Sequence, residues 1–212
     1  MKKSIIWIIT TFFLMLVAGI VLYSSVRPCK LETHEYEIKE NFNDITIIAD
    51  TTDIQLILSE NQSTFIVCEE EKNANHSVVV KENTLRIEAV NNKKWYEHIG
   101  INISTPKITV YLGKNGCANI SLKTDTGDIS LDNIIASGKL VIEVDTGNVN
   151  FEACDASEVF IKTDTGNVAG SFLTDKVVFA ESETGNIDIP KVIADEKCEV
   201  ITYTGNIKIT IE

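Results

Sequence analysis

The second half of the chain repeats one pattern of apolar and polar positions five times. Each copy is centred on a glycine that follows a threonine and precedes Asn or Asp, and successive glycines lie 19 or 20 residues apart. The five are Gly127, Gly147, Gly166, Gly185 and Gly205. A weaker copy, residues 49–54, lies upstream with Thr52 in place of the glycine. A period this constant predicts a repeat architecture.

Apolar and polar residues alternate on both sides of each glycine. Around Gly147, for example, Leu140 and Ile142 precede the glycine, and Val149 and Phe151 follow it. A period of two indicates strand, turn and strand, and leaves no window for a helix. We therefore predict an all-β, single-domain β-solenoid (β-helix-like) with rungs of 19–20 residues. Equivalent strands of successive rungs would pair, and their apolar residues would stack inside the coil.

The glycine marks a corner of each rung. Glycine adopts positive φ without the steric cost of a Cβ atom, and neighbouring Asp, Thr and Asn side chains bond exposed backbone groups at turns. Stacking would also align the asparagines that follow four of the glycines into an amide ladder. These are Asn148, Asn167, Asn186 and Asn206.

One outward column of the repeat is apolar. Six residues before the glycine stand Val141, Phe160 and Phe179, which would form a stripe if the rungs stack in chain order. An exposed apolar stripe is covered either by another part of the chain or by a partner. These three residues are our candidate binding site.

The first half of the chain is less regular. Residues 44–58 fit an opening rung, and residues 65–68, 77–80 and 85–89 have the composition of strands, with a hairpin turn at 81–84. We predict a domain over residues 41–212, in which 60–107 form a hairpin and loop insertion and 119–212 form the regular rungs.

The N-terminal segment has a different character. Residues 5–23 are apolar except for Thr10 and Thr11, and as a helix they would span about 28 Å, close to the roughly 30 Å hydrocarbon core. A cleaved signal peptide would have a shorter apolar region and a small-x-small site. We predict an uncleaved transmembrane signal anchor, with residues 1–4 in the cytoplasm. Residues 24–40 would be a juxtamembrane linker, and the domain would lie outside the cytoplasm, although flanking positive charges nearly balance.

Charge and composition exclude some classes of partner. The formal net charge is −12, and the acids concentrate in the repeats. Nucleic-acid binding needs a basic surface, so we exclude it. The five cysteines, Cys29, Cys68, Cys117, Cys154 and Cys198, have neither metal-site spacing nor the pattern of a disulfide scaffold.

No catalytic motif is found in the sequence. The histidines, His34, His76 and His98, precede the repeats without ligand spacing. The turn acids Asp125, Asp145, Asp164 and Glu183 suggest calcium, but the glycine-rich nonapeptide of calcium-binding β-rolls is missing, and acids are ordinary in turns. We predict no catalytic residues, no metal and no cofactor.

The motifs together resemble a known family. The opening rung (Phe42 to Leu56), the I-x-V-Y-L strand (residues 108–112) and the serial [DE]-T-G-[ND]-[IV] rungs are similar to the bacterial putative-adhesin family of unknown function, the LiaG-like and YvlB-like envelope proteins. The similarity covers roughly residues 40–212. It implies a β-solenoid that is often membrane-attached and linked to envelope stress, and it supplies no functional residues.

Three functions follow from these expectations. The first is a membrane-anchored, extracytoplasmic, non-enzymatic binding or adhesion module, monomeric, with an envelope protein or glycan as partner. The second is a self-assembling envelope scaffold, because the C-terminal rung (residues 197–212) would leave an open strand edge. The third is a carbohydrate-active β-helix enzyme, which would need acids clustered in a groove.

Overall fold

The structure is a computed structural model that describes residues 26–27, 31–71, 74–91, 101–102 and 105–212. The chain divides into two compact units. In the first, residues 1–30 and 92–104, the described strands β1 (Val26–Arg27) and β8 (Ile101–Asn102) pair in parallel. The predicted anchor, residues 5–23, lies outside the described residues. Within the described part of the chain, no helix has the length and apolarity to cross a membrane.

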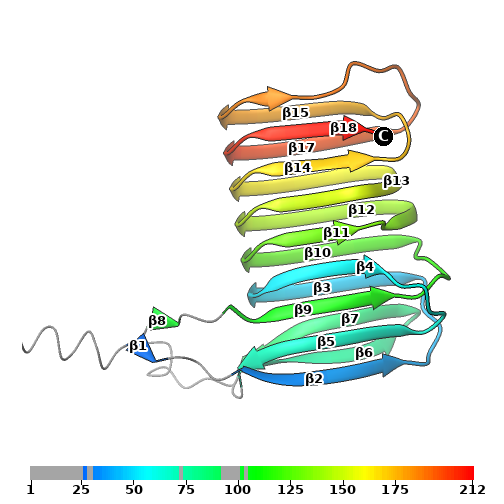
Figure 1. Cartoon of the computed structure of the whole chain (residues 1–212), viewed down its shortest axis with the longest axis vertical. Helices are drawn as coiled ribbons and strands as arrows, with labels where there is room; N and C mark the ends of the chain where they lie inside the picture. Colours follow the sequence, from blue (N-terminus) through cyan, green and yellow to red (C-terminus); the bar gives the residue numbers. More distant parts are fainter. Residues whose placement is uncertain (1–25, 28–30, 72–73, 92–100, 103–104) are drawn as a thin grey trace, which may run out of the picture. The chain divides into compact units, whose positions relative to one another are not determined.

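The second unit, residues 31–91 and 105–212, consists of stacked rungs (Figure 1). Each rung has two strands joined at a corner, and each strand pairs in parallel with its equivalent on the next rung. The rung strands are β3 (Asp44–Thr51), β4 (Asp53–Leu58), β10 (Asn119–Thr126), β11 (Ile129–Asp132), β12 (Ile135–Thr146), β13 (Val149–Thr165), β14 (Val168–Phe172), β15 (Val177–Thr184), β16 (Ile187–Asp188), β17 (Lys197–Thr204) and β18 (Ile207–Ile211). β13 is long enough to serve two rungs. The described secondary structure is thus all-β, and the rung strands stack as a solenoid.

The order of the rungs departs from chain order at the C-terminal end. β17 pairs with the second half of β13 on one side and with β15 on the other. β18 likewise lies between β14 and β16. The C-terminal rung is therefore inside the stack, and the rung formed by β15 and β16 is outermost (Figure 1). The expectation that the C-terminal rung is the open edge is wrong.

Side-chain composition explains this order. The inward residues of β17 and β18 include Cys198, Val200, Ile207 and Ile209, all buried. On β15, Val178 pairs with Cys198, but the smaller Ala180 pairs with Val200 and Ser182 pairs with Thr202. Pro190, which cannot donate a backbone hydrogen bond, follows the two-residue β16. The more apolar rung gains more from being covered on both sides. The outermost rung exposes Glu181 and Glu183, and charged side chains oppose further strand pairing.

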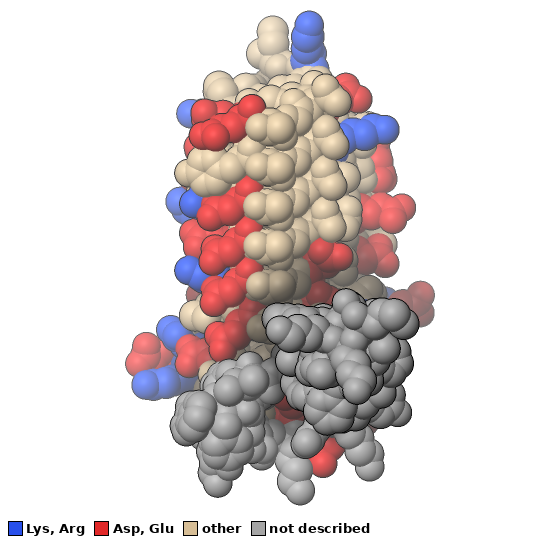
Figure 2. All heavy atoms as spheres, turned by 90° about the vertical axis from the view of Figure 1, so that its left-hand side faces the viewer, with Lys and Arg blue, Asp and Glu red and all other residues tan. Residues whose placement is uncertain are grey.

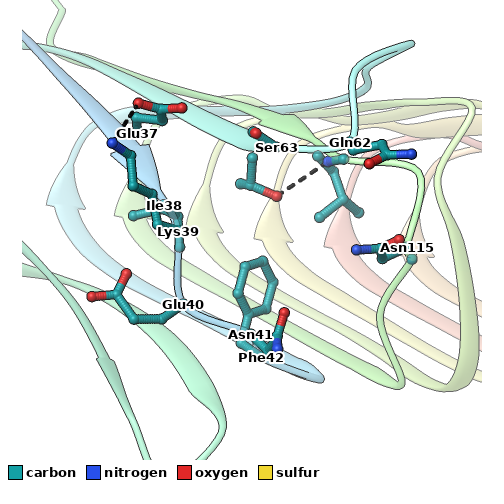
Figure 3. A pocket seen from close by; sticks show the side chains of 13 residues that line it. Glu37, Ile38, Lys39, Glu40, Asn41, Phe42, Gln62, Ser63 and Asn115 are labelled. Carbon is teal, nitrogen blue, oxygen red and sulfur yellow. Dashed lines mark hydrogen bonds and ion pairs between the residues drawn. The ribbon is translucent and has the colours of Figure 1, made fainter.

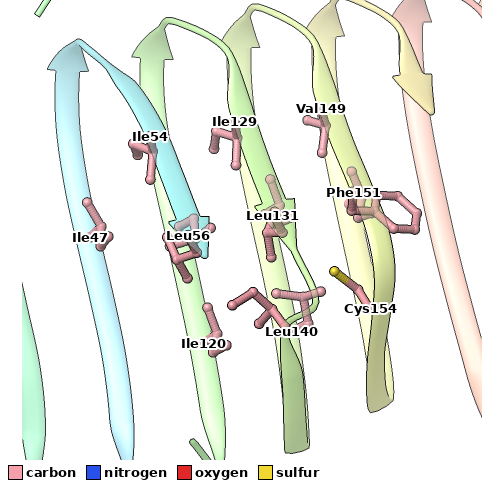
Figure 4. Packing of buried hydrophobic residues seen from close by; sticks show 14 of the residues in the cluster. Ile47, Ile54, Leu56, Ile120, Ile129, Leu131, Leu140, Val149, Phe151 and Cys154 are labelled. Carbon is pink, nitrogen blue, oxygen red and sulfur yellow. The ribbon is translucent and has the colours of Figure 1, made fainter. Parts of the chain in front are cut away.

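The core is built from columns of equivalent apolar residues inside the coil. One column contains Ile47, Leu122, Ile142, Ile161 and Val200, which the pairing places on successive rungs. Figure 4 shows the same stacking for Ile54, Ile129 and Val149. Position 170 in this packing is a glycine because a Cβ atom there would lie 2.4 Å from the ring of Phe151. The Phe151 ring on one rung fills the space that the absent side chain of Gly170 leaves on the next rung.

The corner glycines are required by close packing between rungs. An ideal Cβ atom at Gly147 would lie 2.0 Å from the carbonyl oxygen of Gly127, and one at Gly166 would lie 1.8 Å from that of Gly147. Gly205 and Gly185 continue the same column. Positive φ, which we expected to require glycine at every corner, does not account for all five. The angle φ is +147° to +159° at four corners, but at Gly166 it lies outside the left-handed range. Close contact, rather than φ, excludes a side chain at Gly166.

The first end of the unit contains antiparallel strands. β6 (Ala74–Lys81) and β7 (Thr84–Asn91) form a hairpin whose turn residues Glu82 and Asn83 have positive φ, which confirms the predicted turn. β7 pairs in parallel with β3, and β9 (Lys107–Leu112) pairs in parallel with β4. β5 (Thr64–Glu71) lies antiparallel between β9 and β2 (Leu31–Ile38).

Candidate functional site

The predicted apolar stripe is interrupted. Val141 lies beside Phe160, but the C-terminal rung places Glu199 between Phe160 and Phe179. Val141 and Phe160 are half-buried, whereas Phe179 is 57% exposed on the outermost rung. The prediction of one continuous three-residue stripe is therefore wrong. Val141 and Phe160 remain as an apolar pair, and the carboxylate of Glu199 separates them from Phe179.

The corner edge carries a ladder of side-chain hydrogen bonds. Asn148 donates its amide to Asp128, Asn167 donates to Asn148, and Asn206 donates to Asn167, at 3.2 Å in each case. The backbone N–H of Asn186 then donates to the Asn206 side-chain oxygen. The ladder confirms the rung order. Figure 2 shows this edge as a column of small uncharged groups beside acidic side chains. The four turn acids are Asp125, Asp145, Asp164 and Glu183.

A groove runs across the outward face of the second strands of several rungs. Its volume is about 630 Å³. Its floor includes outward residues of successive rungs that lie side by side in register, namely Gln55, Ser130, Asn150, Ala169 and Lys208. Further lining residues are the paired Asp132 and Glu152 and the paired Ser171 and Thr210, and the register between β13 and β14 shifts between these two pairs. The groove thus offers hydroxyl, amide and carboxylate groups at the regular rung spacing of about 4.8 Å.

A second cavity, of about 390 Å³, lies near the end of β2 (Figure 3). Phe42 and Ile38 supply apolar side chains, and Glu37 pairs with Lys39 at 3.4 Å. The hydroxyl of Thr64 accepts a hydrogen bond from the backbone N–H of Gly113 at 3.1 Å, which fixes one wall. The polar groups around it come from strand ends and turns rather than from successive rungs.

A buried lysine contacts neighbouring rungs where the rung order departs from chain order. Lys176 is fully buried, and its Nζ forms ion pairs with Asp155, at 2.6 Å, and with Glu196. The same Nζ donates to the carbonyl oxygen of Ala156 at 2.7 Å. Asp155 belongs to β13 and Glu196 immediately precedes β17, so the lysine links the three rungs that the reordering brings together. Sequence reasoning missed this residue, since a single lysine before a strand reads as solvent-exposed.

A second buried polar cluster joins strands of the first end. Glu70 on β5 is completely buried, and its two carboxylate oxygens contact different histidines. One oxygen lies 2.7 Å from Nδ1 of His34, on β2. The other accepts from the backbone N–H of His76, on β6, and lies 2.7 Å from its Nδ1. Cys68 lies two residues before Glu70, on the same face of β5, and is buried.

The cluster has the composition of a metal site. One ligand atom each from Cys68, Glu70 and His76 lie within 4.8 Å of one another. The sequence spacing hid the cluster, because 36 residues separate His34 from Glu70 and the antiparallel pairing of β2 with β5 brings them together. His98, the third histidine, lies outside the described residues.

Burial governs the chemistry of the thiols. Desolvation, together with the charge of Glu70, raises the pKa of Cys68 to about 12. Desolvation likewise raises the pKa of Cys117 and Cys198 to about 12 and that of Cys154 to about 11. These four cysteines are free in the described part of the chain and are protonated at neutral pH. Cys29 lies outside the described residues.

Comparison with known proteins matches this architecture. Residues 42–211 match the family model described as Toastrack DUF4097. A crystal structure named "putative cell adhesion protein", from Clostridium sporogenes, is 14% identical, with a TM-score of 0.64, over 86% of this chain and 100% of that one. A "putative adhesin" from Bacteroides fragilis is 19% identical, with a TM-score of 0.50, over 85% and 97%. Among curated proteins, none matches the sequence.

Proposed function

The chain belongs to the Toastrack DUF4097 family, and from that premise we propose that it is a non-enzymatic binding or adhesion module of the cell envelope. The observation that carries the proposal is the groove across β4, β11, β13, β14 and β18. The solved structures support it by fold, and their names refer to adhesion. At their level of identity the binding role is carried over as part of this proposal.

The groove suits an extended ligand rich in hydroxyl and amide groups. Ser130 and Asn150 lie side by side on adjacent rungs and present such groups at the floor. Strand pairing holds both rungs, so the groove needs little ordering when a ligand binds. The net charge of −12 disfavours polyanions. A neutral glycan chain of the envelope is therefore the proposed ligand class, with an extended segment of an envelope protein as the other outcome.

Membrane attachment is part of the proposal. The apolar residues 5–23 would anchor the chain as a single-pass helix and hold the solenoid outside the cytoplasm. Protease added to intact cells or protoplasts should then remove the domain and leave the N-terminal segment in the membrane. Complete protection of the domain until the membrane is permeabilised would reverse the orientation.

The binding face is tested by two variants in the same rung. Ser130 on β11 and Ser121 on β10 are both half-buried, but they lie on the two different strands of the rung, and only Ser130 lines the groove. We expect Ser130→Arg in the full-length chain to weaken co-sedimentation with isolated cell-wall glycan at least about tenfold, through steric filling of the groove. Ser121→Arg should bind like the unmodified chain. Equal binding by both variants would exclude this face.

Self-assembly through the outermost rung is the second candidate. Among the described strands, β15 pairs only with β17, so one side of its backbone is open, and Phe179 is exposed beside it. The backbone N–H of Val177 points to the β17 side, so alternation directs that of Ala180 to the open side. If β15 mediates assembly, Ala180→Pro should abolish higher oligomers in sedimentation. We expect a monomer for both forms, because Glu181 and Glu183 repel a second edge.

A further inference from the structure

The cluster around Glu70 brings together four side chains that bind transition metals. Cys68, Glu70 and His76 are buried, and their ligand atoms lie within 4.8 Å of one another. His34 completes the set at 2.7 Å from the second Glu70 oxygen, and its side chain is 44% exposed. Three strands contribute, so the arrangement depends on the folded first end of the solenoid. The exposed imidazole gives an ion access from solvent.

We infer that this cluster is a zinc site, with Cys68, Glu70, His76 and His34 as its ligands. Thiolate and imidazole ligands favour zinc over the hard cations calcium and magnesium, and a carboxylate is an accepted fourth ligand. Ligand atoms of a tetrahedral zinc site lie about 3.3–3.8 Å apart, as follows from bonds of about 2.0–2.3 Å. The ligand atoms of Cys68, Glu70 and His76, which lie within 4.8 Å of one another, need to approach by about 1 Å. The 2.7 Å contacts of Glu70 with Nδ1 of His76 and His34 need to lengthen, and both changes are side-chain adjustments.

Charge balance supports the assignment. A divalent cation, the Cys68 thiolate and the Glu70 carboxylate together are neutral, which suits a site where three of the four ligands are buried. The backbone N–H of His76 donates to Glu70 at 2.7 Å. This bond does not use the imidazole, so it holds the carboxylate when Nδ1 of His76 turns to the metal. Without a metal, both imidazoles hydrogen-bond the carboxylate.

Cobalt(II) distinguishes a metal site from a hydrogen-bonded cluster. The full-length chain is stripped with a chelator and titrated with Co²⁺ and then with Zn²⁺. We expect one ion per chain and a sulfur-to-cobalt charge-transfer band, which zinc abolishes by displacing the cobalt. Zinc should also raise the midpoint of thermal unfolding. Failure to bind a stoichiometric ion, or binding without the thiolate band, would overturn the assignment.

Variants identify the ligands. Cys68→Ser and His76→Gln should each weaken zinc binding at least about a hundredfold, because each removes a direct ligand. Cys154→Ser is the matched control: it removes an equally buried thiol outside the cluster and should leave zinc affinity unchanged. Unchanged zinc affinity in Cys68→Ser would refute the site. If that variant does not fold, the cobalt spectrum of the unmodified chain decides by itself.

Discussion

Replacing Gly166 by alanine tests how closely the rungs pack at their corners. The new Cβ atom would lie 1.8 Å from the carbonyl oxygen of Gly147 and 2.6 Å from its carbon. Cβ atoms in proteins essentially never approach other heavy atoms below 3.0 Å, so the two rungs must separate locally by about 1 Å. The obstacle is backbone on both sides, which cannot move aside as a flexible side chain can.

The size of the effect follows from the hydrogen bonds at this corner. The Gly147 carbonyl oxygen accepts from the Thr163 hydroxyl at 3.1 Å, and the Gly147 N–H donates to the Thr165 carbonyl at 2.9 Å. A shift of about 1 Å breaks the first bond and strains the second. Each buried polar group left without a partner costs about 1–3 kcal/mol. We therefore expect Gly166→Ala to lower the free energy of unfolding by about 2–5 kcal/mol.

Urea denaturation of the full-length chain, followed by circular dichroism, measures this change. Gly116→Ala is the control, because φ there is +69° but no atom lies within 4 Å of the new Cβ. It should cost only about 1 kcal/mol, the penalty for left-handed backbone. If Gly166→Ala costs no more than Gly116→Ala, the close contact between corners does not exist.

Three further predictions concern buried polar groups. Thr163→Val removes the hydroxyl that donates to the Gly147 carbonyl oxygen. It should lower the free energy of unfolding by about 1 kcal/mol in urea denaturation. Lys176→Met leaves two acidic side chains without their buried partner and should cost about 2–4 kcal/mol, whereas Lys139→Met, at an exposed ion pair, should cost under about 1 kcal/mol. The pKa of Cys117 and Cys198 is raised by folding from 9.0 to about 12, so their stabilising contribution is complete below about pH 9 and is lost as the pH rises towards 12. Stability measured across this range should fall less steeply in a Cys117→Ala, Cys198→Ala double variant.

Each of these predictions has a contrary outcome. Unchanged stability of Thr163→Val would mean that the corner hydroxyl contributes nothing, as at the equivalent Val144, where the sequence has no hydroxyl. Equal effects of the two lysine substitutions would remove Lys176 from the account of the rung order. An identical alkaline slope in the double variant would show that other groups govern the loss of stability at high pH.

The repeat made the rung predictable from sequence. Inward positions such as Ile142, Ile161 and Val200 are core residues in the structure, because period-two alternation reports which side of a strand is covered. The order of the rungs could not be predicted. Spacings of 19 and 20 residues allow β17 to pair on either side of β15, and the deciding signals are weak. They are the small Ala180 and Ser182 on one rung and the more apolar Cys198 and Val200 on the other.

Sites that depend on the rung order, or on strand pairing in the irregular first half, could not be predicted from the sequence. The candidate stripe assumed that Phe179 follows Phe160, and the reordering places Glu199 between them. His34 and His76 approach Glu70 only through the antiparallel pairing of β5 with β2 and with β6. No repeat marks this region, so the sequence alone could not predict which strands pair.

Photocrosslinking in the native membrane tests whether the groove contacts an envelope ligand. A photoreactive amino acid at position 130, in the groove, is compared with one at position 121, on the other strand of the same rung. We predict a discrete crosslinked product with an envelope glycan or protein from position 130, and none from position 121. Products from position 121 alone, or only crosslinks to further copies of the chain, would contradict a binding module that uses this groove.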